Sequence, residues 1–499
     1  MERETKAAWT FRGLVAVLLV GYGVLLFFHK STSVGGSDSS GYLNAARAIA
    51  SGRVLEPIDA LARLKQPVSR QRLFIPLGYI PGHRTGTMVT MYPIGLPLQA
   101  IALAAIFGWS VGPFLIGPLS AVVSVLLVYL CARELDLPRL AAAAAAAMFA
   151  SVPVLTFFAL QLMSDVPAAL WALAAVWLAL KSRGSALWAA GAGMAFGIGV
   201  LVRPSSAILL LPLAFALAPS IRAWAAFLAG GIPAACVFLT FNRAAYGGPL
   251  RTGYSEISAE SSFSLANLPS RLAHYAYWIS AMMSPLILPV WLAAAFDRLR
   301  PLRRRLLLFS WFAVFYLFYS TYGPYETWWY TRYLLPGIPA LAIAAAVAGV
   351  DLLAWFRNRP GSAARRVGKW VVAASFVLVC GKGIRVAHRF DLLDVGRGES
   401  AYPETVRWAA ARVPARSLVL AMQFSGAMRC YGLRELVRWD WIDPKDFPVF
   451  RRETEAAGYR FYALMLPFEV EQATQLLPKG WKFVGSNRGA SLFELPPER

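Results

Sequence analysis

The sequence contains little charge and few cysteines. Charged residues make up 15% of its 499 residues and hydrophobic residues 58%, far more apolar than a soluble globular chain of this length. Its four cysteines show no CxxC pair and no metal-ligand spacing; they are Cys131, Cys236, Cys380 and Cys430. We therefore expect neither a disulfide framework nor a structural zinc site. Lipid is expected to be the main solvent of the chain.

Several catalytic motifs are also absent from the sequence. It contains no Walker A motif, no GxGxxG that opens a helix, no HExxH, no GxSxG and no histidine cluster. These absences exclude P-loop ATPases, Rossmann enzymes and zincins. The apolar segments also lack the regularly spaced acids and matching broken helices that would favour a proton-coupled transporter.

The charge that is present is mainly positive, with a net value of +22 at pH 7. Almost all of the excess of Lys and Arg lies before Ala387, in the apolar part of the chain. Basic loops in such a chain mark the cytoplasmic side of the membrane and meet anionic lipid phosphates. We therefore expect membrane lipids as partners and no nucleic acid.

The first apolar run, Trp9 to Phe28, is long enough to span the hydrocarbon core of a membrane. Basic residues precede it and no small-residue cleavage site follows, which predicts a retained helix with its N-terminus inside. Residues 29–92 are expected to form a large first external loop. Within this loop we expect a short amphipathic helix at 42–50, N-capped by the cluster Ser37 to Ser40.

The remaining apolar segments predict a polytopic α-helical membrane protein with about 11–13 transmembrane helices. They lie near 93–109, 111–132, 140–161, 166–181, 186–202, 206–221, 223–243, 275–296, 306–322, 333–355 and 369–386. Basic loops such as 298–305 and 357–369 are expected in the cytoplasm, which leaves the C-terminus outside. This topology needs an odd number of crossings. Either 93–109 dips without crossing, or one helix escapes detection.

After residue 386 the composition changes to that of a soluble domain. Apolar or alternating runs predict strands at 417–422, 460–466 and 481–484, with helices at 403–412 and 469–477 between them. The chain is thus expected to comprise a transmembrane domain, 1–386, and a small extracytoplasmic α/β domain, 387–499.

Two acids stand out on the expected external side. Asp38, in the first loop, could accept a proton from an acceptor hydroxyl, although an aspartate here could also simply cap the helix. Asp165 interrupts an otherwise apolar hairpin, where an ionised group needs a partner or a wet cavity. Its alternative role is again that of a helix cap, with Pro167 in the first turn.

Arginines gather on the same expected side, and their planar guanidinium groups suit the oxygens of a phosphate. The candidates are Arg203, Arg243, Arg251 and Arg332. An alternative for each is to anchor the chain at the membrane interface. Aromatic residues between Tyr319 and Tyr330 are typical of an interfacial belt, but such a belt does not require the acid Glu326.

Five segments in fixed order carry a resemblance to a known group. They are Ser37-Asp38 through Arg47, Tyr92-Pro93-Ile94-Gly95-Leu96-Pro97, Ser164-Asp165-Val166-Pro167, Arg203-Pro204 and Arg332-Tyr333-Leu334-Leu335-Pro336. In order and spacing they resemble the GT-C superfamily of integral-membrane glycosyltransferases, which includes protein O-mannosyltransferases and lipid A aminoarabinose transferases.

The resemblance implies a glycosyltransferase that takes its sugar from a polyprenyl-phosphate donor. It implies Asp38 as the catalytic base, Asp165 as the second acidic catalytic position and Arg332 as the residue for the donor phosphate. Many relatives carry paired acids in the first loop, whereas Ser39 follows Asp38 here. The residues expected to bind substrate are Tyr42, His83, Arg84, Tyr92, Arg203, Arg251, Glu326, Arg332 and Tyr333.

The expected acceptor is a lipid, a glycan or a protein on the outer face of the inner membrane. No cofactor and no metal ligand is expected, with a bound divalent cation left open. Three alternatives remain at this point: a transporter or flippase of lipid-linked saccharides, a polymerase or ligase of another membrane fold, and a non-catalytic scaffold. The collection of acids and arginines on one side disfavours the scaffold.

Overall fold

The computed structural model describes residues 2–256, 263–298, 300–323, 327–360, 362–433 and 435–497. The chain forms two compact units, each assembled from three stretches of sequence. We call the first the helical unit; it comprises Met1–Lys30, Leu115–Val237 and Ser258–Val395. We call the second the loop–sheet unit; it comprises Ser31–Phe114, Phe238–Ile257 and Gly396–Arg499. The expected domain boundary at 386/387 stays a prediction.

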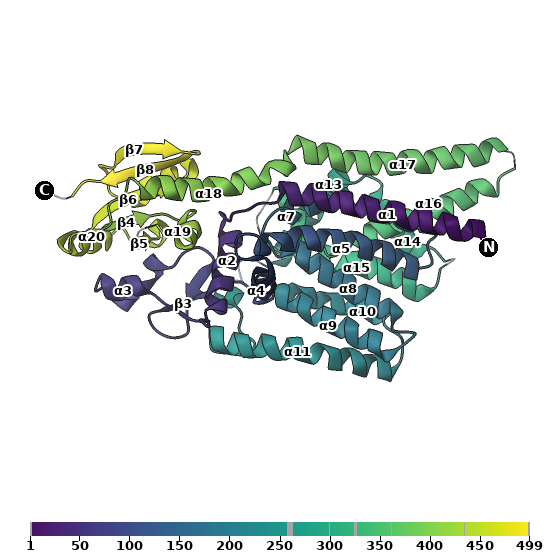
Figure 1. The fold of residues 1–499 in the computed structure, drawn as a ribbon, viewed down its shortest axis with the longest axis horizontal. Coiled ribbons are helices and arrows are strands. Elements are labelled where there is room, and N and C mark those ends of the chain that lie inside the picture. Colours follow the sequence, from purple (N-terminus) through teal and green to yellow (C-terminus); the bar gives the residue numbers. More distant parts are fainter. Residues whose placement is uncertain are drawn as a thin grey trace. The chain divides into compact units, whose positions relative to one another are not determined.

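The helical unit consists of long apolar helices that pack around one core, within which α8, α9, α10 and α15 run side by side (Figure 1). Its helices are α1 (Glu2–His29), α5 (Gly112–Glu134), α6 (Arg139–Ala150), α7 (Pro153–Ala159), α8 (Asp165–Lys181), α9 (Ala186–Val202), α10 (Leu210–Ala216), α11 (Ile221–Tyr246), α13 (Leu268–Met282), α14 (Ile287–Phe296), α15 (Leu302–Ser320), α16 (Ile338–Arg357) and α17 (Ser362–Arg389). The predicted polytopic helical class is confirmed.

Four of these helices are long and apolar enough to cross a membrane, namely α5, α11, α16 and α17. Two bent helix pairs raise this number to six if each pair is one span, counted over the residues that the structure describes. The helical unit also contains shorter apolar helices, among them α9. The number of crossings therefore stays a prediction.

Two of the apolar segments each contain a break between two helices. Segment 140–161 forms α6 and α7, which meet at 62°, and segment 275–296 lies in the pair α13 and α14, which meet at 104°. Pro153 opens α7 and Pro285 lies in the second break. Proline lacks an amide donor and disfavours helix in the residue before it, which explains both breaks.

The first loop is more structured than expected. A helix, α2, spans Ser37–Ala50, and the preceding residue Gly36 provides no side-chain cap, so the predicted capping by the Ser37 to Ser40 cluster is wrong. The loop also contains α3 (Asp59–Arg63) and three short strands, which form an antiparallel sheet in the order β1 (Glu56–Pro57), β3 (Thr87–Thr90), β2 (Tyr79–Pro81). Helix α4 (Gly95–Phe107) packs against α2 within the same unit.

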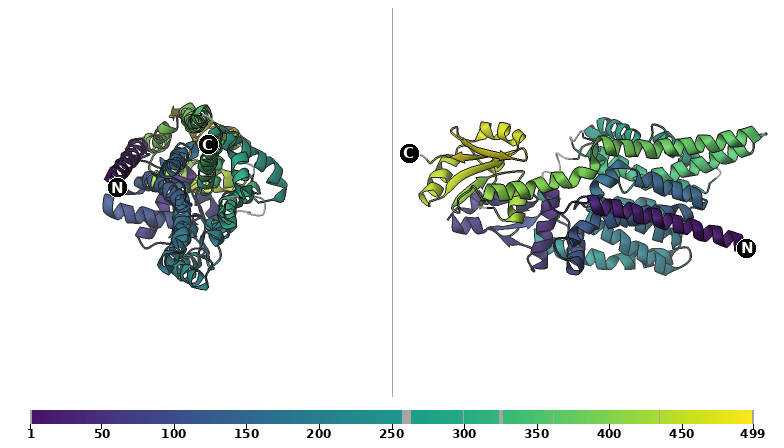
Figure 2. Two further views of the ribbon diagram at one scale, coloured as in Figure 1. Left: turned by 90° about the vertical axis from the view of Figure 1, so that its right-hand side faces the viewer. Right: turned by 45° about the horizontal axis from the view of Figure 1, so that its top comes forward.

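The C-terminal segment contains a five-stranded mixed sheet, drawn in yellow and green in Figure 2. Its order is β5 (Glu435–Val437), β4 (Ser417–Leu420), β6 (Arg460–Met465), β8 (Ala490–Leu495) and β7 (Lys482–Asn487). Strands β5, β4 and β6 are parallel, and β8 is antiparallel to both β6 and β7. Its helices are α18 (Val395–Ala410), α19 (Ser425–Tyr431), α20 (Phe447–Ala456) and α21 (Pro467–Leu476). The small C-terminal α/β domain is confirmed; β5, β8, α19 and α20 were not predicted.

The first loop and the C-terminal sheet share one hydrophobic core. Phe74 and Tyr79 of the loop pack in the same cluster as Leu420, Phe450 and Phe461 of the C-terminal segment. A buried ion pair lies within the same unit, between Glu56 of β1 and Arg429 of α19, at 2.5 Å. The loop therefore folds together with a segment that follows it by more than 300 residues.

Close packing in the helical unit depends on small residues, as is usual for helices without a hydrophobic driving force between them. A Cβ atom added at Gly193 of α9 would lie 1.8 Å from the carbonyl oxygen of Phe227 in α11.

We expect Gly193→Ala to reduce the free energy of unfolding by about 1–3 kcal/mol, the usual effect of overpacking. Denaturation of the detergent-solubilised protein measures this change.

The matched control is Gly21→Ala in α1, where an added Cβ meets nothing within 4 Å. Alanine in an exposed helical position is at least as favourable as glycine, so this variant should be as stable as the parent protein. Equal stability of both variants would show that α9 and α11 do not pack closely at Gly193.

Candidate active site

Asp38 is the second residue of α2 and is half-buried. The N-terminus of a helix favours negative charge, because its first amide groups point outward without intrahelical partners. The phenolic hydroxyl of Tyr92 donates a hydrogen bond of 2.7 Å to Oδ1 of Asp38. Asp38 is therefore held in one orientation by a donor from the other end of the first loop.

Tyr92 is itself fixed by close contacts within the loop–sheet unit. Its ring packs against the ring of Tyr42, with 4.4 Å between the centroids. An added Cβ at Gly41 would lie 2.2 Å from the Tyr92 ring, so the ring packs directly against the backbone of Gly41.

The hydroxyl of Tyr92 is held in its protonated form. Burial first, and then the charge of Asp38, raise the pKa of Tyr92 well above its usual value. Tyr92 consequently stays protonated and remains a hydrogen-bond donor to Asp38. The structure thus brings together three expected site residues: Asp38, Tyr42 and Tyr92.

A fourth polar group at this cluster was not predicted. Glu399 of α18 accepts hydrogen bonds from the backbone amide of Gly35 at 2.6 Å and from the hydroxyl of Ser39 at 2.9 Å. In the sequence Glu399 lies in an ordinary polar stretch, so no local pattern distinguishes it. We call Asp38, Ser39, Tyr92 and Glu399 the Asp38 cluster.

Asp165 lies in the helical unit, at the first position of α8, and is fully buried. Arg203 donates to its Oδ1 at 2.6 Å and to the hydroxyl of Ser164 at 3.1 Å. Arg332 lies further away, with Nε at 3.9 Å from the same Oδ1. The carboxylate thus organises two arginines from separate segments, and both stay partly exposed, at 15% of the side chain.

Tyrosine rings surround these arginines. The guanidinium carbons of Arg203 and Arg332 lie 5.5 and 5.1 Å from the ring centre of Tyr333. Tyr333 in turn stacks on Tyr319 at 4.7 Å, whose hydroxyl is 2.6 Å from that of Ser205. Tyr330, from the expected aromatic belt, also lies against Arg332, with 5.6 Å between the guanidinium carbon and the ring centre. We call Asp165, Arg203, Arg332 and Tyr333 the arginine cluster.

Other expected site residues lie elsewhere. His83 and Arg84 are exposed in the turn between β2 and β3, and Nδ1 of His83 is 3.2 Å from the carbonyl oxygen of Ala245. Arg251 is exposed and its side chain lies over Gly248. None of these three contributes a contact to the Asp38 cluster described above. Glu326 lies outside the described residues.

The described part of the chain offers no cluster of metal ligands. There, no three side chains of His, Cys, Asp or Glu gather closely enough to hold an ion. The arginine cluster gathers two guanidinium groups around one carboxylate, and guanidinium groups are suited to bind oxyanions.

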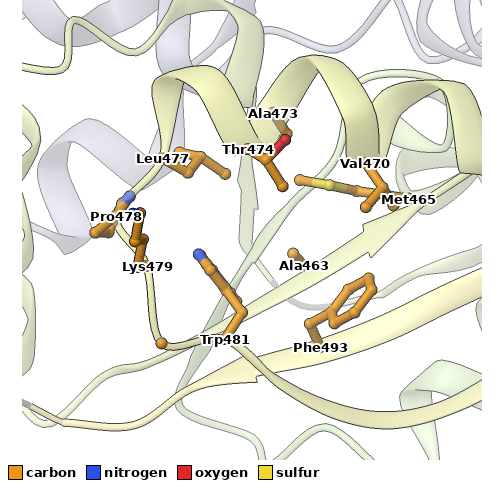
Figure 3. Close-up of a pocket in the computed structure, with 11 residues that line it drawn as sticks. Ala463, Met465, Val470, Ala473, Thr474, Leu477, Pro478, Lys479, Trp481 and Phe493 are labelled. Carbon is orange, nitrogen blue, oxygen red and sulfur yellow. The ribbon is translucent and has the colours of Figure 1, made fainter.

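A separate cavity of about 400 Å³ lies between α21 and the C-terminal sheet (Figure 3). Its walls are mainly apolar and include Met465, Val470 and Phe493, with Lys479 and Trp481 at one side. No carboxylate lines it. The cavity thus offers mainly apolar surface, and the two clusters remain the candidate catalytic groups.

Comparison with known proteins shows which fold the chain shares. The family model described as Dolichyl-phosphate-mannose-protein mannosyltransferase matches residues 93–241. No curated protein matches the chain by sequence. The chain has the fold of GT-C membrane glycosyltransferases, which confirms the resemblance inferred from the sequence motifs.

The similar structures share the fold at low sequence identity. ArnT from Cupriavidus metallidurans in the apo state has a TM-score of 0.60 and 15% identity, over 98% of this chain and 99% of that chain. The same protein bound to undecaprenyl phosphate has a TM-score of 0.57 and 15% identity, over 96% and 98%. The oligosaccharyltransferase AglB from Archaeoglobus fulgidus, in complex with an inhibitory peptide and a dolichol-phosphate, has a TM-score of 0.52 and 13% identity, over 98% and 75%.

The Asp165–Arg203 pair generates a prediction on stability. Asp165→Asn keeps the shape of the side chain but removes the charge that faces Arg203. Removing one partner of a buried ion pair usually destabilises a protein by about 3–5 kcal/mol. The control is Asp136→Asn, because Asp136 pairs with Arg304 while 72% of its side chain is exposed, and this change should have little effect. Chemical denaturation of both variants measures the difference, and equal effects would contradict a structural pairing at Asp165.

Proposed function

We propose that this protein is a membrane glycosyltransferase that moves a sugar from a polyprenyl-phosphate donor to a hydroxyl-bearing acceptor. The acceptor is a lipid, a glycan or a protein on the outer face of the cytoplasmic membrane. The observation that carries the proposal is the half-buried Asp38, oriented by the hydroxyl of Tyr92 at the start of α2. The GT-C fold supports it, as does the binding of undecaprenyl phosphate by ArnT, a structural relative.

Asp38 acts as the general base in this proposal. Its carboxylate takes the proton of the acceptor hydroxyl while the acceptor oxygen attacks the anomeric carbon of the sugar. The bond between this carbon and the phosphate oxygen breaks, and the phosphate leaves on the polyprenyl lipid. A single displacement of this kind inverts the configuration of the anomeric carbon. Tyr92 keeps the carboxylate in one rotamer, which reduces the entropy lost on reaching the transition state.

The arginine cluster binds the donor phosphate. Arg203 and Arg332 present guanidinium groups, which bind phosphate oxygens in pairs and remain charged at all relevant pH values. Fixed positive charge stabilises the negative charge that grows on the leaving phosphate, and such stabilisation is often the main source of rate enhancement in an enzyme. Asp165 holds the arginines through its Oδ1, so its contacts favour a positioning role over proton transfer.

The remaining features define the setting of the reaction. Nucleotide sugars are absent outside the cytoplasmic membrane, so an activated sugar must arrive on a lipid. Basic loops at 298–305 and 357–369 support a cytoplasmic location for these loops and an extracytoplasmic C-terminal domain. The arginines can supply the positive charge by themselves, and a divalent cation would add to it.

The base assignment predicts that Asp38→Asn lowers the turnover number for sugar transfer by about 10²-fold or more. Asparagine has the same size and can still accept the hydrogen bond from Tyr92, but it does not take up a proton. The melting temperature in detergent should be unchanged. Radiolabelled sugar transfer by the purified enzyme, measured at saturating donor, gives the turnover number.

The control is Asp59→Asn, because Asp59 is exposed and also lies in the first turn of a helix in the same loop, α3. This variant should transfer sugar at the parental rate. If Asp38→Asn also transfers at the parental rate, Asp38 has no role as the base. If it transfers no sugar but still moves lipid-linked saccharide across a membrane, the protein is a flippase.

The phosphate assignment predicts that Arg332→Ala raises the KM for the donor about ten- to a hundredfold, the equivalent of losing a charged hydrogen bond of about 1.5–3 kcal/mol. Arg332→Lys should restore only part of the loss, because lysine does not bind an oxyanion bidentately. Initial rates over a donor series measure the KM. The control is Arg304→Ala, whose side chain pairs with the exposed Asp136. Equal donor KM in the Arg332→Ala and Arg304→Ala variants would contradict the assignment.

A further inference from the structure

Helix α18 of the C-terminal segment contacts the turn that carries Asp38. A single carboxylate oxygen, Oε2 of Glu399, accepts hydrogen bonds from the amide of Gly35 and the hydroxyl of Ser39. These two donors flank Asp38 in sequence, and Ser39 is 3% exposed. Any movement of this turn would therefore break bonds to Glu399.

The same turn is also held by ring packing. One turn of helix after Glu399, the ring of Tyr402 covers Gly35, where an added Cβ would lie 2.0 Å from the ring. The hydroxyl of Tyr431 donates to the carbonyl oxygen of Val34 at 3.0 Å and accepts from its amide at 2.9 Å. The C-terminal segment thus fixes the backbone on the N-terminal side of Asp38.

The N-terminus of α2 lacks a side-chain cap of its own. Its N-cap residue, Gly36, forms no side-chain hydrogen bond, and the first amide groups of a helix need acceptors from elsewhere. Glu399 supplies a negatively charged acceptor at this position, where the helix dipole favours it. Glu399 therefore holds the chain just before α2 through the amide of Gly35, and the first turn of α2 through the hydroxyl of Ser39.

A glutamate is an unfavourable choice for a purely structural anchor here. Burial, together with the nearby charge of Asp38, raises the pKa of Glu399, while the bonds from Ser39 and the backbone lower it. A neutral acceptor could make the same hydrogen bonds without placing a second carboxyl group beside Asp38. Glutamine at this position should therefore hold the turn as glutamate does, which provides a test of what the side chain contributes.

We propose that Glu399 is a positioning residue for Asp38, so that the C-terminal domain completes the catalytic unit. This inference rests on the proposed function, because it assumes that Asp38 is the base. Glu399 itself takes no proton from the substrate. Through Gly35 and Ser39 it keeps the Asp38 carboxylate at the place that the acceptor hydroxyl must reach.

Two substitutions separate positioning from proton transfer. Glu399→Ala removes both hydrogen bonds, and we expect the turnover number to fall about 10²-fold, as a displacement of about 1 Å can do, while the donor KM stays unchanged. Glu399→Gln keeps a carbonyl oxygen that can accept from Gly35 and Ser39, so it should restore most of the turnover. If Glu399→Gln is as inactive as Glu399→Ala, the carboxylate itself is required and the positioning role is wrong.

A second readout does not depend on catalysis. Amide hydrogen exchange of the full-length protein in detergent, followed on peptides that cover residues 34–44, should be faster in Glu399→Ala and near parental in Glu399→Gln. The double variant Ser39→Ala with Glu399→Ala should lose little more turnover than Glu399→Ala alone, because the bond between these two side chains is already absent in the single variant. Unchanged exchange in Glu399→Ala would overturn the proposal.

The matched control is Glu469→Ala in the same domain. Glu469 is fully buried and accepts from the amides of Met422, Gln423 and Leu466, away from the Asp38 cluster. This variant should lower stability while the folded fraction turns over at the parental rate. If Glu399→Ala behaves in the same way, Glu399 is only structural.

The outcomes also separate this inference from the proposed function. Loss of transfer in Asp38→Asn with parental turnover in Glu399→Ala overturns the positioning role alone. Parental transfer in Asp38→Asn overturns the base assignment and, with it, any positioning role for Glu399.

Discussion

A charged group in apolar surroundings needs a partner, and this constraint accounts for much of the polar structure of the protein. Asp165 is fully buried and binds Arg203, while Glu56 binds Arg429. In each case the pair joins segments that are distant in sequence, so the charges also fix where these segments lie. The apolar helices form the hydrophobic core of the helical unit, and the ion pairs fix the polar segments that lie at the ends of helices and strands. Arg203 and Arg332, which we propose bind the donor phosphate, both lie against Asp165.

A shared hydrophobic core and a buried-carboxylate ion pair join the first loop and the C-terminal segment into one unit. The apolar residues of the loop share one core with the sheet formed by residues 417–495. Glu399 accepts hydrogen bonds from Gly35 and Ser39 at the start of α2. The C-terminal domain is thus part of the same folded unit as the first loop, because its residues contact the turn that carries Asp38.

The sequence predicted those features that depend on local pattern. The length of the apolar runs predicted the helices. Asp38 and Asp165 stood out because each is an acid in apolar or loop surroundings. Proline explains the breaks before α7 and α14, which were not predicted. Glu399 could not be found in this way, because its partner Ser39 is 360 residues away and the surrounding sequence is ordinary. The short strands of the first loop and β5 were missed for a related reason, since runs of two to four residues carry no readable period.

The central claim is that the protein breaks the bond between a sugar and a polyprenyl phosphate. The most direct measurement incubates the purified protein with a panel of polyprenyl-phosphate sugars and a mixture of membrane acceptors, and follows the release of free polyprenyl phosphate. We expect release from at least one donor of the panel, with the sugar recovered on an acceptor and inverted at its anomeric carbon. Movement of intact donors across liposome membranes without release from any of them would contradict the claim.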